Sequence, residues 1–177
     1  MRTTVLTLVI GASLLAGCSG PAEGEPEAAP SAPVRATAAA GGACRLLDHE
    51  LITRSLGLDL SVAGSAKKGK TNTCVARRTD TPLPELSLSV TPTTADVAVF
   101  KDTIPPDGAS TVTELGRVAY QSVRPAASGR GPSVEIGWLA GNARLILLKV
   151  TLPAGGDSAA LAPKLVDLAR EIDRAGI

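Results

Sequence analysis

The spacing of apolar residues divides the chain into three stretches. From Thr4 to Gly17 the residues are almost all apolar, whereas residues 19–43 consist mainly of Pro, Ala, Gly and Glu with almost no large apolar side chain. From Cys44 onward, apolar and polar residues recur with the periods of helices and strands. We therefore expect three units: an N-terminal segment at 1–17, a flexible tether at 18–43 and a globular domain at 44–177.

The pattern of the domain predicts a helix at each end. After Cys44, Leu47 and Leu51 fall on one side of a helix, for which Asp48 fits the N-cap and Gly57 the C-terminal stop. A second apolar stripe closes the chain and comprises Leu161, Leu165, Leu168 and Ile172. For this last helix we expect Ser158 as the cap, Pro163 within the first turn and Gly176 as the stop.

Between these helices the pattern predicts a sheet. Residues 85–92 alternate strictly, which is typical of a strand with one buried face. Residues 145–150 are apolar on both faces, which places their strand in the centre of the sheet. The remaining expected elements are strands at 74–78, 117–124, 133–139 and 143–152, a Gly/Lys-rich loop after residue 57, and a short helix at 93–102 with a Thr cap. The sequence thus predicts an α+β fold, a mostly antiparallel sheet with an N-terminal and a C-terminal helix packed on it.

Composition narrows the function classes. The 177 residues have a formal net charge of +1, and aromatic residues make up 2% of them. A general nucleic-acid binder would carry a clear basic excess, so this balance argues against one. It also argues against charge as the main attachment to an acidic membrane. The core must be built from aliphatic side chains.

The N-terminal segment has the form of an export signal. Arg2 precedes an apolar run that is shorter than the ~20 residues needed to span a bilayer, and small residues follow it. Leu15-Ala16-Gly17-Cys18 resembles the lipobox of bacterial lipoprotein precursors. That resemblance implies cleavage before Cys18, a lipid anchor on Cys18 and a position on the extracytoplasmic face of the cell membrane. Two or three acyl chains would anchor the protein stably. The alternative is an ordinary secretory signal with a chance cysteine.

Two further cysteines lie in the domain, at Cys44 and Cys74. Exported domains meet oxidising conditions, so we expect these two to form a disulfide. A free redox thiol and a metal ligand are the alternatives, but CxxC spacing and neighbouring ligands are lacking.

The domain also resembles a family of actinobacterial lipoproteins known as a domain of unknown function. The features that carry the resemblance are a Cys-x-Leu-Leu start at Cys44, a helix ending in Leu56-Gly57, Leu115-Gly116 with Ala119, a strand bearing Trp138 and a final amphipathic helix. The resemblance covers about residues 43–177. It implies placement and fold, and it supplies no catalytic residues.

Residues 64–71, GSAKKGKT, match the P-loop pattern, but the residues that follow do not suggest the long helix that a P-loop needs, so we expect no nucleotide. A flexible Lys/Gly loop accounts better for this segment. Its Lys67, Lys68 and Lys70, together with Arg77 and Arg78 on the nearby strand, form either a solvated basic face or a patch that contacts anionic headgroups or acidic envelope polymers. In the second case, salt-sensitive binding would follow.

Catalysis has little support in the sequence. His49 is the sole histidine, the residue four positions later is Thr53, and no serine has a nucleophile-elbow sequence. We therefore expect neither an enzyme nor a metal or other cofactor. The sequence predicts a membrane-anchored lipoprotein whose domain is a binding or interaction module for an envelope protein or small ligand. The alternative is a carrier or sensor of a small apolar ligand.

Overall fold

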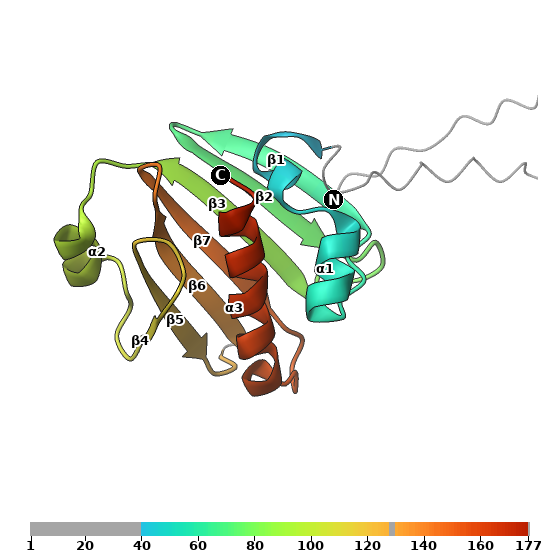
Figure 1. Ribbon diagram of the computed structural model, residues 1–177. Coiled ribbons are helices and arrows are strands. Elements are labelled where there is room, and N and C mark those ends of the chain that lie inside the picture. Colours follow the sequence, from blue (N-terminus) through green and yellow to red (C-terminus); the bar gives the residue numbers. More distant parts are fainter. Residues whose placement is uncertain (1–39, 128–129, 177) are drawn as a thin grey trace, which may run out of the picture. The chain divides into compact units, whose positions relative to one another are not determined.

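The fold is built on one antiparallel sheet of seven strands, shown in Figure 1 of the computed structural model, which describes residues 40–127 and 130–176. The strands are β1 (Val62–Lys68), β2 (Thr71–Arg77), β3 (Glu85–Pro92), β4 (Ser110–Val112), β5 (Val118–Arg124), β6 (Ser133–Ala140) and β7 (Arg144–Thr151). Their order is β1-β2-β3-β7-β6-β5-β4, so the strand that is apolar on both faces, β7, lies in the centre. The predicted α+β fold is confirmed.

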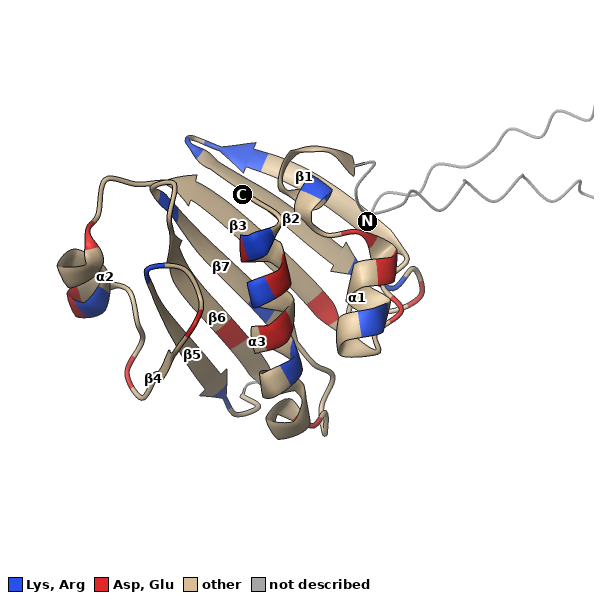
Figure 2. Cartoon of the chain, viewed as in Figure 1, with Lys and Arg blue, Asp and Glu red and all other residues tan. Residues whose placement is uncertain are grey.

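Helices cover one face of this sheet. The 3-10 helix η2 (Gly42–Leu46) and the helix α1 (His49–Leu56) lie toward the β1–β3 side, and α3 (Ser158–Arg174) lies over β5 and β6 and beside α1. The short helix α2 (Val97–Thr103) lies apart from them beyond the β5 side of the sheet (Figure 1). Charged residues concentrate on the outer side of α3, in the turns and at the strand ends (Figure 2).

The predicted ends of α1 are confirmed. The Asp48 carboxylate accepts a hydrogen bond of 2.8 Å from the Leu51 amide, and Gly57 has the left-handed φ of 70° that ends the helix.

For the other two helices the predicted caps were wrong. Asp96 caps α2 instead of a threonine, and Asp157 caps α3 instead of Ser158, which is the first residue of the helix. Each aspartate lies immediately before its helix and accepts from the amide three residues later, so its negative charge also faces the positive end of the helix.

Pro163 lies inside α3, beyond the predicted first turn. A proline there cannot donate a hydrogen bond to the carbonyl four residues earlier. Its ring is exposed, whereas Leu161, Ala162, Leu165 and Val166 around it are buried, so packing on the sheet holds the helix together across the missing bond.

The Gly/Lys-rich segment was predicted as a loop, but residues 62–68 form the edge strand β1. Its middle residues, Gly64, Ser65 and Ala66, are exposed, so the strand lacks the alternation of buried and polar positions by which strands are recognised.

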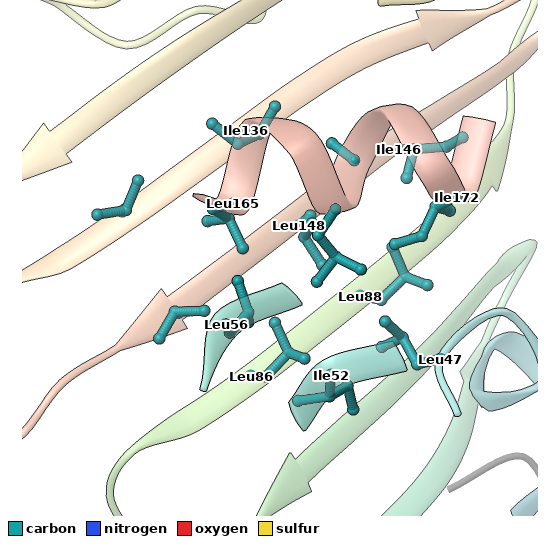
Figure 3. Close-up of a cluster of buried hydrophobic side chains, with 14 of the residues drawn as sticks. Leu47, Ile52, Leu56, Leu86, Leu88, Ile136, Ile146, Leu148, Leu165 and Ile172 are labelled. Atoms are coloured by element: carbon teal, nitrogen blue, oxygen red, sulfur yellow. The ribbon is translucent and has the colours of Figure 1, made fainter. Parts of the chain in front are cut away.

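The main core lies between the sheet and the helices α1 and α3. Leu86 and Leu88 of β3, Leu148 of β7 and Ile52 of α1 are fully buried there, and Figure 3 shows Leu88 and Leu148 near α3 and Leu86 next to Ile52 of α1. Leu165 and Ile172 point down from α3 into the same cluster. The aliphatic core expected from the composition is confirmed, with Trp138 as its one large aromatic member.

The opposite face of the sheet is covered over one part by α2. Phe100 of α2 packs with Tyr120 of β5 and Leu139 of β6 in a second, smaller cluster. Gly137 makes this arrangement possible, because a Cβ at that position would collide with the Tyr120 ring. The β2–β3 part of this face carries half-buried threonines and serines and Val75.

Candidate functional site

The two cysteines of the domain form the predicted disulfide. Cys44 in η2 and Cys74 in β2 are joined by an S–S bond of 2.00 Å, with their Cα atoms 4.8 Å apart. Both residues are fully buried. The bond fastens the start of the domain to the sheet.

The predicted lipidation site, Cys18, lies outside the described residues, as do the segment 1–17 and the tether up to residue 39. Within residues 40–127 and 130–176, none of the helices combines the length and the apolar character that crossing a membrane requires.

The five residues of the predicted basic patch do not lie together. Lys67, Lys68 and Lys70 occupy the tip of the β1–β2 hairpin, whereas Arg77 and Arg78 are at the other end of β2 (Figure 2). Six residues of strand separate the two groups by roughly 20 Å. The guanidinium of Arg78 is paired with the Asp80 carboxylate at 3.0 and 3.1 Å, and these hydrogen bonds lower the pKa of Asp80.

The structure places two arginines at the same end of the sheet as the three lysines. The sheet register puts Lys67 opposite Asn72, and Asn72 lines a surface hollow of about 290 Å³ together with Arg45 of η2 and Arg144 of β7. The other lining residues are Gly42, Ala43, Leu46, Val90 and Gly176, so the lining contains no acidic residue. We call Arg45, Lys67, Lys68, Lys70 and Arg144 the basic end of the sheet.

These five cations have no acidic partner among the described residues. Three ion pairs between an arginine and a carboxylate occur there, Arg54–Glu171, Arg78–Asp80 and Arg170–Asp167, together with a His49–Asp59 contact, and none involves the basic end. All five side chains belong to exposed residues. Guanidinium groups suit phosphate and carboxylate oxygens, and an amide donor such as Asn72 adds a hydrogen bond. The basic end can therefore hold an anionic group against a partly apolar wall.

The structure explains why the P-loop pattern has no P-loop geometry. Residues 64–71 run through β1 and into β2 as an antiparallel hairpin, with residues 69–70 in the turn and no helix following it. A P-loop needs a helix N-terminus directly after its glycine-rich turn to hold the phosphates.

His49 has a structural position between α1 and the segment that follows it. Its Nδ1 atom lies 3.3 Å from the Leu60 carbonyl oxygen and its Nε2 atom 3.5 Å from an oxygen of Asp59. No serine or cysteine is among these contacts. The described residues also contain no group of three His, Cys, Asp or Glu side chains placed to hold a metal ion.

Two hydrogen-bonded pairs of polar side chains were not predicted from the sequence. The Tyr120 hydroxyl donates a 2.8 Å hydrogen bond to Glu135, and burial together with this bond raises the pKa of Tyr120. The Trp138 indole N–H donates a 3.0 Å bond to Asp173, whose second oxygen accepts from the Gly116 amide at 3.3 Å. Both pairs fix tertiary structure, because each joins segments that are distant in sequence.

Arg45 and Arg144 were also missed as members of a site. The turn predicted before residue 143 places Arg144 at an end of its strand. The order of the strands, which puts this end of β7 on the same side of the sheet as the β1–β2 hairpin, could not be derived from the pattern of apolar and polar residues. Comparison with protein families, curated proteins and solved structures found no match to this chain.

Proposed function

We propose that the protein is a lipid-anchored extracytoplasmic lipoprotein whose α+β domain serves as an interaction module. The observation that carries this proposal is the sequence Leu15-Ala16-Gly17-Cys18 at the end of a short apolar run that starts after Arg2. An anchor on Cys18 would hold the domain at the membrane surface through a segment without large apolar side chains.

The disulfide supports an exported location. Disulfides persist in oxidising compartments and are rare in the cytosol, and the buried Cys44–Cys74 bond accounts for both cysteines of the domain. Cys18 is then the remaining cysteine of the sequence and is available for the proposed lipid attachment.

The packing favours an interaction module over a carrier. The side chains between the sheet and its helices, such as Trp138, Leu148 and Leu165, are fully buried against one another. The hollow at the basic end lies at the surface and is lined by charged, polar and small residues as well as Leu46 and Val90. A carrier of an apolar ligand would need an enclosed apolar cavity.

The test is the Cys18→Ala variant of the full chain, expressed in a bacterial host that is fed an alkyne-labelled fatty acid. Ser19→Ala is the matched control, since it changes the neighbouring residue and leaves the cysteine in place. We expect Ser19→Ala to be labelled and to sediment with membranes, and Cys18→Ala to lose the label and leave the membrane fraction. Retention of an unlabelled, unprocessed Cys18→Ala chain in the membrane would mean that the apolar run itself is the anchor.

A further inference from the structure

We infer that the basic end of the sheet is the face that the domain turns toward the membrane, where it contacts anionic phospholipid headgroups. This inference rests on the proposed lipid anchor and specifies the surface that the anchored domain uses. The hypothesis from the sequence placed Arg77 and Arg78 in the patch; the surface inferred here contains Arg45 and Arg144 instead and lies across one end of the sheet.

Positive charge without an acidic partner is concentrated at the basic end. Arg45, Lys67, Lys68, Lys70 and Arg144 lie at one end of the sheet, and none of them takes part in an ion pair among the described residues. At the opposite end, where Arg124 and Arg130 also lie, Arg78 is paired with Asp80, and Glu85 lies directly across from Arg77 in the register. A charge distribution of this kind orients a nearly neutral domain toward an anionic surface without attracting it strongly from a distance.

The chain enters the domain beside the strand that carries Lys67 and Lys68. The backbone carbonyl of Ala40, the first described residue, accepts a 2.7 Å hydrogen bond from Ser65 of β1. The helix η2 follows, and its Arg45 lines the hollow. The tether therefore reaches the domain beside the middle of β1, three residues before Lys68. The 21 residues from Ser19 to Ala39 can extend at most about 70 Å, which keeps the domain near the membrane at a high effective concentration.

The hollow combines cationic and apolar groups. Arg45 and Arg144 share it with Asn72, while Leu46 and Val90 contribute apolar wall. A phospholipid headgroup offers a phosphate for the guanidinium groups, and glycerol or acyl carbons beside it suit the apolar wall. An acidic polymer offers the charge without an adjoining apolar part, so the membrane is the better fit.

The test is lysine acylation of the lipidated full chain, reconstituted by its anchor in vesicles and read by peptide mass spectrometry. Vesicles rich in phosphatidylglycerol are compared with vesicles of phosphatidylcholine alone. We expect Lys67, Lys68 and Lys70 to react roughly fivefold more slowly on the anionic vesicles. Lys164, which is exposed and lies near the start of α3, far from the Gly176 end that lines the hollow, serves as the internal control and should react equally on both. Raising the salt from about 0.1 M to about 1 M should remove the protection.

A pair of double variants tests the contribution of the arginines. Arg45→Gln with Arg144→Gln should reduce the protection of the three lysines severalfold. Arg124→Gln with Arg130→Gln, at the opposite end of the sheet, should leave it unchanged. The emission of Trp138 checks that every variant is folded.

The outcomes separate this inference from the proposed anchor. Equal acylation of the hairpin lysines on both kinds of vesicle, with the chain still bound to them, would overturn the docking surface and leave the anchor standing. A chain that carries no lipid and does not float with the neutral vesicles would overturn both. Protection by added polyglutamate but not by anionic vesicles would assign the surface to an acidic polymer instead of the membrane.

Discussion

The two faces of the sheet differ although the same strands build them. On the face beneath α1 and α3, Leu86, Leu88 and Leu148 are fully buried, whereas their neighbours Ser87 and Leu147 on the other face are half-buried. Alternation with a period of two sends successive side chains of one strand into these two environments. The face beneath α1 and α3 therefore holds the larger share of the buried core, and on the other face apolar side chains are fully buried only where Phe100, Tyr120 and Leu139 pack together.

Hydroxyl groups take the place of apolar packing on the second face. Thr71 and Thr91 are hydrogen-bonded at 2.8 Å, and Thr73 and Ser89 at 3.2 Å, across the β2–β3 pair. Such cross-strand pairs contribute a few tenths of a kcal/mol up to about 1 kcal/mol each, well below the value of a buried leucine.

The largest contrast is expected for two neighbouring leucines of β7. Leu148→Ala should lower the free energy of unfolding by about 3–4 kcal/mol, because it leaves a cavity under α3. Leu147→Ala removes the same atoms from the half-buried face and should cost about half as much. Urea denaturation of both variants measures the difference. Equal losses would mean that the two faces contribute alike.

The next largest effect on the free energy of unfolding is expected from the disulfide, which lies on the face of the sheet beneath the helices. Replacing Cys44 and Cys74 together by alanine should destabilise the domain by about 3 kcal/mol, since the bond closes a 30-residue separation and both side chains are buried. Thermal unfolding of the double variant against the parent protein checks this. An unchanged midpoint would show that the packing of η2 on the sheet suffices without the bond.

A smaller effect is expected where α3 is fastened to β6. Asp173→Ala leaves the Trp138 indole N–H and the Gly116 amide without their acceptor and should cost about 1–2 kcal/mol. Because Trp138 is the sole tryptophan, its fluorescence reports the change directly. Asp167→Ala on the same helix is the control, since its exposed pair with Arg170 should contribute less than about 0.5 kcal/mol.

The hydrogen-bonded pair of Tyr120 and Glu135 on the second face should make the stability of the domain depend on pH at high pH and not near neutral pH. The folded-state pKa of Tyr120 is raised, so the unfolded chain releases this proton first, and stability is lost as the pH rises above the ordinary value of about 10. Tyr120 is the sole tyrosine, so phenolate absorbance follows it alone. A midpoint at the ordinary value would contradict the burial under α2. Tyr120→Phe should remove this part of the pH dependence.

The smallest effect is expected in the hydroxyl pairs. Thr91→Val keeps the β-branched shape and removes the hydrogen bond to Thr71, so the free energy of unfolding should change by no more than about 0.5 kcal/mol. Chemical denaturation measures it. A loss as large as that of Leu147→Ala would show that the second face is tightly ordered by its hydroxyls.

The same contrast explains what could be predicted from the sequence. The strand at Glu85–Pro92, the central position of β7 and the ends of α1 were predicted correctly, because buried faces and caps leave a local pattern. The strand β1 was missed, since both of its faces are largely exposed and its residues carry no alternation.

The candidate site was predicted in part for a related reason. The lysines of the hairpin are adjacent in sequence and could be recognised, whereas Arg45 and Arg144 join them only through the pairing of β2, β3 and β7. Arg77 was wrongly grouped with the lysines, because closeness in sequence along an extended strand still means a distance of roughly 20 Å.

The edge strand β1 has a further consequence for molecules crowded together on one surface. An exposed sheet edge invites the same edge of another copy to pair with it and begin an aggregate. Two lysines, Lys67 and Lys68, stand at the end of β1, and η2 with Ala40 lies against its middle. At the other edge of the sheet, β4 has three residues and therefore has few free backbone groups with which another strand could pair. A chain anchored as proposed would thus stay separate from its neighbours at the local concentrations that anchoring creates.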